Sequence, residues 1–120
     1  MTLDEAKAWE ATISRMSHNP RRKRASRIPV EGRVTKREVR DMLQSQDFRC
    51  AVTGVHLIPF EAGEPKPFQP SLDRIENDEG YALHNVRIVA LIVNVAMNRW
   101  GEQPLFELFR QQTAVAPTSD

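Results

Sequence analysis

The segment from Pro70 to Gly101, PSLDRIENDEGYALHNVRIVALIVNVAMNRWG, restricts the possible fold more than any other part of the chain. Its beginning, SLDRI, is a candidate strand, and NVRIV shows the two-residue alternation and β-branched content of a second strand. From Ala90 to about Asn98 the pattern becomes helical, with Leu91, Val95 and Asn98 on or near one face, and Gly101 ends it. The order strand, loop, strand, helix predicts an α+β domain built around this segment.

Helices are also predicted on both sides of this segment. The first has apolar residues at helical spacing after a Thr2–Glu5 capping-box pattern, namely Leu3, Ala6, Trp9, Ile13 and Met16. A second capping-box pattern, Thr35 with Glu38, precedes the apolar face of a short helix, formed by Val39, Met42 and Leu43. FRCAVTGVHL predicts two strands around a turn at Gly54. A last helix opens near Pro104 and carries an apolar stripe of Leu105, Leu108 and Phe109.

Length and composition restrict the class of protein. A chain of 120 residues is of single-domain size, and its one cysteine, Cys50, excludes a disulfide framework and a thiolate zinc site made by this chain alone. No apolar run approaches the roughly 20 residues of a membrane span. We therefore expect a soluble cytoplasmic protein, with N-terminal helices over residues 1–47, a central unit and C-terminal helix over 48–112, and a disordered tail over 113–120.

Charge is distributed unevenly, although the net charge is only +1. An arm over about residues 20–40 is rich in Lys and Arg, whereas residues 61–79 carry an excess of Asp and Glu. A basic arm beside an acidic centre suits a nucleic acid held against a cation site, but a solvated basic linker has the same composition. The arm residues expected to bind DNA phosphates are Arg21, Arg22, Lys23, Arg24 and Arg27.

The segment from Cys50 to Trp100 resembles the HNH endonuclease superfamily, whose core is a ββα-metal finger. Members often carry an Asp-His pair on the first strand, an Asn on the second strand and a His or Asn in the helix. Asp73-Arg74, Asn85 and Asn94 stand in these places here, and nine positions separate the two asparagines, as is usual in the family. Small bacterial and phage HNH-like proteins with Arg in place of the His are especially similar. The resemblance implies a ββα finger with flanking N- and C-terminal helices.

The resemblance also implies roles for these residues. Asp73 and Asn94 would hold a divalent cation such as Mg²⁺ through oxygen atoms. Asp73 could instead hydrogen-bond the turn that follows it, and Asn94 could serve a buried backbone group. Asn85 belongs to the catalytic motif as the residue that holds the loop.

Arg74 is the main departure from the family pattern. The family's histidine takes a proton from water, whereas arginine has a pKa above 12 and stays charged at neutral pH. Its planar guanidinium can bind a phosphate through two hydrogen bonds instead. His84, next to Asn85, is then the candidate general base, although a surface histidine is the commoner explanation of such a residue.

A second departure concerns zinc. Many members carry cysteines where this chain has Thr53, Ala90 and Val93, so no structural zinc is expected here. Apolar packing is expected to replace the zinc, and Cys50 is expected to be a buried small apolar residue. The residues expected to provide this packing are Val52, Ala90, Val93 and Trp100.

Three classes of function remain after these considerations. The leading hypothesis is an HNH-type, metal-dependent endonuclease that hydrolyses phosphodiester bonds in double-stranded DNA. A non-catalytic DNA-binding protein with the same fold is the alternative, in which Arg74 contacts phosphate and no water is activated. An adaptor that binds protein rather than DNA is the third. For the nuclease, the catalytic residues are Asp73, Arg74, His84 and Asn85.

Overall fold

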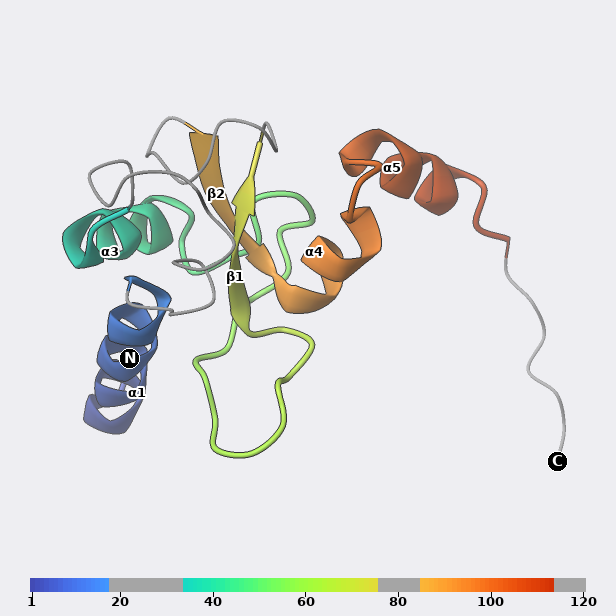
Figure 1. Cartoon of the computed structure of the whole chain (residues 1–120). Helices are drawn as coiled ribbons and strands as arrows, with labels where there is room; N and C mark the ends of the chain where they lie inside the picture. The colour runs from blue at the N-terminus through green and yellow to red at the C-terminus, as the bar shows by residue number, and fades with distance from the viewer. Residues whose placement is uncertain (18–33, 76–84, 114–120) are drawn as a thin grey trace, which may run out of the picture.

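The computed structural model describes residues 1–17, 34–75 and 85–113, which form a small α+β domain (Figure 1). This described part contains four helices and a two-stranded sheet. The helices are α1 (Leu3–Ser17), α3 (Lys36–Ser45), α4 (Leu91–Met97) and α5 (Glu102–Arg110), and the strands are β1 (Pro70–Arg74) and β2 (Val86–Ala90). Among the described helices, none combines the length and hydropathy needed to cross a membrane.

Several expectations fall on residues 18–33, 76–84 and 114–120, which lie outside the described residues. They concern His84, the turn before it, most of the expected C-terminal tail and the basic arm residues Arg21, Arg22, Lys23, Arg24 and Arg27.

The two strands pair antiparallel, with Pro70 opposite Ala90 and Arg74 opposite Val86. Side chains alternate between the faces of a strand, and directly opposed residues share a face. One face therefore presents Ser71, Asp73, Arg87 and Val89. In Figure 1 the sheet lies between α1 and α3 on one side and α4 and α5 on the other.

Helices α1 and α3 begin at the residues that the capping patterns predict. The Thr2 Oγ1 atom accepts a hydrogen bond from the Glu5 backbone N–H at 3.1 Å. Both bonds of the second capping box form, because Thr35 Oγ1 accepts from the Glu38 N–H and Glu38 Oε1 accepts from the Thr35 N–H. Satisfying these N–H groups locally fixes the first turn of each helix.

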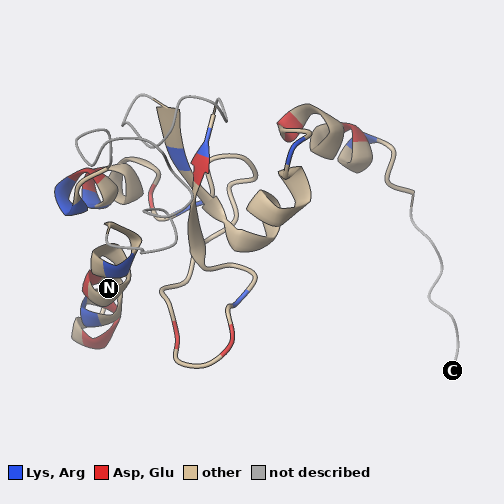
Figure 2. Cartoon of the chain, in the orientation of Figure 1, with Lys and Arg blue, Asp and Glu red and all other residues tan. Residues whose placement is uncertain are grey.

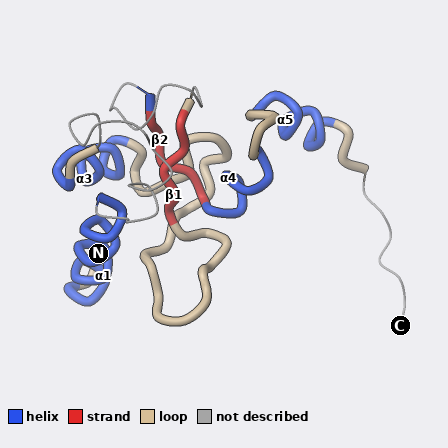
Figure 3. Tube along the Cα trace, viewed as in Figure 1, coloured by secondary structure: helices blue, strands red, loops and turns tan. Residues whose placement is uncertain are grey.

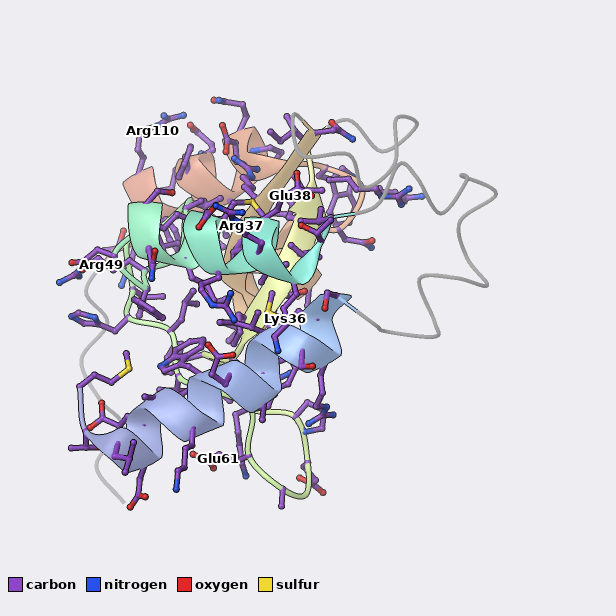
Figure 4. All side chains as sticks on the ribbon, turned by 90° about the vertical axis from the view of Figure 1, so that its left-hand side faces the viewer. Lys36, Arg37, Glu38, Arg49, Glu61 and Arg110 are labelled. Atoms are coloured by element: carbon purple, nitrogen blue, oxygen red, sulfur yellow. The ribbon has the colours of Figure 1, made fainter. Side chains whose placement is uncertain are left out.

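The core combines residues of both N-terminal helices with residues of β2, α4 and α5. Trp9 of α1 packs edge-on against Phe48 at a ring separation of 5.0 Å, and Val39 and Leu43 of α3 are completely buried. The two helices are also linked at the surface, where Lys36 faces α1 and lies 3.7 Å from Glu10 (Figure 4). The apolar faces expected for both helices are confirmed at Trp9, Val39 and Leu43, whereas Leu3, at the start of the first helix, is 71% exposed.

The predicted strand–strand–helix order is found, but the predicted face of its helix is wrong. Helix α4 buries Val93 and Met97, whereas Val95, expected on the main face, is 69% exposed. Trp100 is 63% exposed, so it does not join Ala90 and Val93 in the core. Almost every residue of this helix is apolar, so the sequence pattern could not distinguish its buried face.

Two further expectations need correction. FRCAVTGVHL forms a turn closed by a single bridge between Arg49 and His56 rather than a pair of strands (Figure 3). Helix α5 begins at Glu102 and buries Leu105, but Leu108 and Phe109 are exposed instead of completing an apolar stripe. The expected burial of Cys50 is confirmed.

Candidate functional site

The candidate site lies where β1, β2 and the start of α5 come together. Asp73 and Arg87 are directly opposite each other in the sheet, and Arg87 Nε donates to Asp73 Oδ2 at 2.9 Å. Arg87 Nη1 donates to Glu102 Oε2 of α5 at 2.7 Å. One guanidinium therefore bridges two carboxylates that belong to different elements. In Figure 2 the two strands carry adjacent acidic and basic segments.

These three side chains are partly shielded from water. Asp73 is 14% exposed, Arg87 is 24% exposed and Glu102 is 35% exposed. Burial lowers the pKa of Arg87, but the hydrogen bonds and charges of Asp73 and Glu102 raise it by more than burial lowers it. The pKa of Arg87 therefore lies above its ordinary value. The guanidinium therefore stays charged and neutralises much of the negative charge of Asp73.

Asn94 reaches the same face of the sheet from α4. Its Nδ2 donates to Ser71 Oγ at 2.7 Å and approaches the Leu72 carbonyl oxygen at 3.4 Å. Ser71 and Asp73 are two positions apart in β1, so their side chains point to the same face. Asn94 thus lies on the same face as Asp73. Its amide nitrogen donates hydrogen bonds to β1, which is the structural alternative to metal binding.

Asp73 and Asn94 suit a hard cation by the chemistry of their oxygen atoms. Within residues 1–17, 34–75 and 85–113, no group of three or more His, Cys, Asp or Glu side chains could hold a metal ion. A cation held by one carboxylate and one amide would keep several water ligands, as Mg²⁺ commonly does. By their chemistry alone these donors suit a hydrated Mg²⁺, and any such cation would compete with Arg87 for Asp73.

Arg74 and Asn85 lie where β1 ends and β2 begins. Arg74 is the last residue of β1, is partly buried, and shares the opposite face from Asp73 with Val86. Asn85 is 1% exposed, and its carbonyl accepts a 2.7 Å hydrogen bond from the Ile75 N–H. This backbone hydrogen bond joins the end of β1 to the start of β2, and the holding role expected of the Asn85 side chain stays a prediction.

The turn that begins at Cys50 provides a second polar environment. Burial raises the pKa of the Cys50 thiol, but hydrogen bonds from the Thr53 side chain and from the backbone at Ala90, Thr53 and Val52 outweigh this, so the pKa is lowered. Gly54 closes the turn with a positive φ of 76° and donates its N–H to the Cys50 carbonyl at 2.9 Å. The sulfur is thus held by donors within the protein interior.

Sequence reasoning missed Arg87 and Glu102. The alternation of NVRIV does place Arg87 on the opposite face from Val86 and Ile88, which is a signal for its direction. The pairing of Arg87 with Asp73 can be predicted only from the register of the two strands. The pairing with Glu102 can be predicted only from the position of α5. These contacts are tertiary, so no local pattern contains them.

No protein-family model matches the chain, and comparisons with curated proteins and with solved structures also found no match.

Proposed function

We propose that the chain is an HNH-type, metal-dependent endonuclease that hydrolyses phosphodiester bonds in double-stranded DNA on a ββα-metal fold. The observation that carries the proposal is the hydrogen bond from Asn94 to Ser71, because it puts the amide on the same face of the sheet as the Asp73 carboxylate. The order of β1, β2 and α4 supports it, since these elements supply the motif residues in the order that the family resemblance implies.

The proposed roles follow from the chemistry of each group. Asp73 and Asn94 would hold the cation, which when bound supplies Lewis acidity toward the phosphate oxygens. Arg74 is assigned the phosphate, which its planar guanidinium can bind from the end of β1, although its side chain lies on the opposite face of the strand from Asp73. Asn85 holds the two strand ends in position, and His84 is the candidate base.

A non-catalytic DNA-binding protein is the second candidate, and one observation favours it. Arg87 already neutralises Asp73 through a 2.9 Å ion pair, and Arg74 occupies the place of the expected base. A protein of this kind would use Arg74 and the basic arm to bind phosphates without activating water.

Cleavage of supercoiled plasmid DNA in Mg²⁺, Mn²⁺ or EDTA tests the catalytic proposal. We expect nicking in either metal and none in EDTA, and Asp73→Asn should remove it because the carboxylate would provide the charged ligand. Absence of cleavage under all metal conditions, with DNA binding intact, would instead support the binding protein.

Substitutions at Arg74 test the role of its side chain. Arg74→Ala should reduce the cleavage rate by about 10²–10³-fold, as expected for the loss of one transition-state donor. Arg74→Lys should also impair it, because an ammonium group cannot make two parallel hydrogen bonds. Arg110→Ala is the matched control, since Arg110 is exposed in α5 and pairs with Glu107, and it should cleave normally.

Arg74→His separates the two candidate functions, because it restores the histidine that the family places beside Asp73. Cleavage that survives or rises would agree with a working nuclease site. Cleavage by Arg74→His but not by the natural chain would indicate a DNA-binding protein built on a nuclease fold. If neither cleaves while DNA binding persists, the catalytic proposal is wrong.

The basic arm has a separate test based on salt. Neutralising its residues should weaken DNA binding at every sequence and flatten the dependence of affinity on salt, because fewer counterions are released. The substitutions are to Gln at Arg21, Arg22, Lys23 and Arg24 together. An unchanged slope in a binding titration at several salt concentrations would reduce the arm to a solvated linker.

A further inference from the structure

Arg87 occupies the position of a cation between two carboxylates. Its Nε atom binds Asp73 at 2.9 Å, its Nη1 atom binds Glu102 at 2.7 Å, and its Nη2 atom lies 3.9 Å from Met97 Sδ. Nitrogen atoms on different sides of the guanidinium serve different partners. A stronger bond to one carboxylate therefore draws the group away from the other.

The pair with Asp73 is shielded more than an ordinary surface ion pair. Asp73 is the least exposed of the three side chains. The ion pairs described in the N-terminal half, such as Arg40 with Glu10, involve more exposed side chains. Screening by water and salt is weaker where side chains are partly buried. The charge of Arg87 therefore acts strongly on any second cation that approaches Asp73.

We propose that Arg87 is an internal cation that competes with a divalent metal ion for Asp73, and that Glu102 weakens this competition by holding the other side of the guanidinium. The inference rests on the proposed function in one respect, because it takes Asp73 as a metal ligand. Arg87 and Glu102 are positioning residues in this scheme, and α5 thereby controls how readily the Asp73 carboxylate accepts a metal.

The proposal predicts effects of opposite sign at two residues in direct contact. Arg87→Gln removes the competing charge and leaves two carboxylates uncompensated, so metal binding should become tighter. Glu102→Gln leaves Arg87 with Asp73 alone, so metal binding should become weaker. A purely structural role for the ion pairs would weaken metal binding in both variants, because both would loosen the site.

The size of the effects follows from the influence of a neighbouring charge. A hydrogen bond to a charged group contributes an amount that corresponds to about tenfold or more in an equilibrium constant. A divalent cation meets the same charge, so Arg87→Gln should tighten binding by about tenfold or more. Glu102→Gln acts through Arg87 and should weaken binding by a smaller factor, about three- to tenfold.

The experiment measures Mn²⁺ binding to the full chain by calorimetry and by the electron paramagnetic resonance signal of free Mn²⁺. Matched controls are Arg40→Gln, which breaks the surface pair with Glu10, and Glu107→Gln, which changes charge elsewhere on α5. Neither control should change the dissociation constant appreciably. Circular dichroism of each variant establishes that it is folded at the measuring temperature.

Double variants locate the effect. Adding Asp73→Asn to Arg87→Gln should abolish the gained Mn²⁺ affinity, and persistence of tight binding would place the site elsewhere and overturn the proposal. The effect of Glu102→Gln should shrink in the Arg87→Gln background. An equal effect in both backgrounds would show that Glu102 acts only through its own charge and would overturn its assigned role.

A variant that retains charge covers the case in which Arg87→Gln does not fold. Arg87→Lys keeps the positive charge but has a methylene group where the Nε atom of Arg87 donates to Asp73, so it should hold Asp73 less firmly and bind Mn²⁺ more tightly than the natural chain. Unchanged or weaker binding in Arg87→Lys, with Glu102→Gln also without effect, would overturn the proposal.

Failure of this inference is distinguishable from failure of the proposed function. Tighter Mn²⁺ binding by Arg87→Gln without any DNA cleavage supports the competition and refutes the nuclease. Metal-dependent cleavage by the natural chain, with no gain of affinity in Arg87→Gln, refutes the competition alone. No Mn²⁺ binding by any variant overturns both the competition and the cation site.

Discussion

Gln46, at the C-terminal end of α3, holds the outer edge of β2 with its side-chain amide. Its Nε2 donates to the carbonyl oxygens of Ile88 and Arg49 at 2.8 and 2.7 Å, and its Oε1 accepts the Ile88 N–H at 3.2 Å. The Ile88 carbonyl also accepts from the Ala51 N–H at 3.0 Å. A single side chain thus supplies the hydrogen bonds that a third strand would make to Ile88.

Replacing this amide should destabilise the fold by an amount that the contacts define. Gln46→Met keeps a side chain of similar length but removes the acceptor of the Ile88 N–H. Loss of the partner of a buried donor lowers the free energy of unfolding by about 1–3 kcal/mol. The Ile88 carbonyl keeps Ala51, so the lost bond there costs about 1 kcal/mol. We expect the free energy of unfolding to fall by about 2–4 kcal/mol from these two losses, because water can replace the exposed bond to the Arg49 carbonyl.

Gln46→Glu adds a dependence on pH that tests the direction of each bond. The introduced carboxylate can still accept the Ile88 N–H, but it faces two carbonyl oxygens to which it cannot donate. This environment should raise its pKa in the folded state above the ordinary value of about 4.3. The variant should therefore approach the stability of the natural chain below that pH, and lose stability as the pH rises through the folded-state pKa.

Urea denaturation at neutral pH and near pH 4 measures these differences. Gln44, exposed in the last turn of α3, provides matched controls, because Gln44→Met and Gln44→Glu make the same changes near the same helix end. The controls should stay within about 0.5 kcal/mol of the natural chain. The reasoning is refuted if Gln46→Met costs no more than Gln44→Met, or if the deficit of Gln46→Glu does not shrink on acidification.

Two other predictions concern the N-terminal helices and their core. Leu43→Ala should lower the free energy of unfolding by about 2–5 kcal/mol because Leu43 is completely buried, whereas Leu108→Ala, at an exposed position of α5, should change little in the same urea titration. The hydrogen bond from Arg40 lowers the pKa of Glu10, so this pair contributes stability above the unfolded-state pKa and loses it as the pH falls through the folded-state pKa. The melting temperature of Glu10→Gln should therefore be lower than that of the natural chain near neutral pH. The two melting temperatures should become equal in strong acid, where Glu10 is protonated.

Local sequence signals predicted much of the secondary structure. The capping patterns at Thr2 and Thr35 marked the beginnings of two helices, because the bonds that define them join residues three positions apart. The change of period near Ala90 marked the end of β2 and the start of α4. Each of these signals depends only on neighbouring residues, and the structure contains the expected element in each case.

Features that depend on tertiary packing were not predictable in the same way. The predicted face of α4 was wrong at Val95, which is exposed. Almost every residue of this helix is apolar, so no polar side chains mark the side that faces solvent. The bridge from Asp73 through Arg87 to Glu102 requires the strand register and the position of α5 together. The sequence thus indicated Asp73 and Asn94 as site residues without the basic side chain that lies against Asp73.

The hydrogen bonds that connect α1 and α3 to the rest of the domain join residues that are far apart in the chain. The Gln46 amide reaches Ile88 across 42 positions, and Thr12 of α1 accepts the Phe60 N–H across 48 positions. By contrast, β1, β2 and α4 lie within one stretch of the chain, from Pro70 to Met97. Closing the longer loops costs more entropy, so we expect the strands and α4 to assemble first. During synthesis from the N-terminus, Trp9 and Leu43 therefore leave the ribosome before the strands that complete their core have been made.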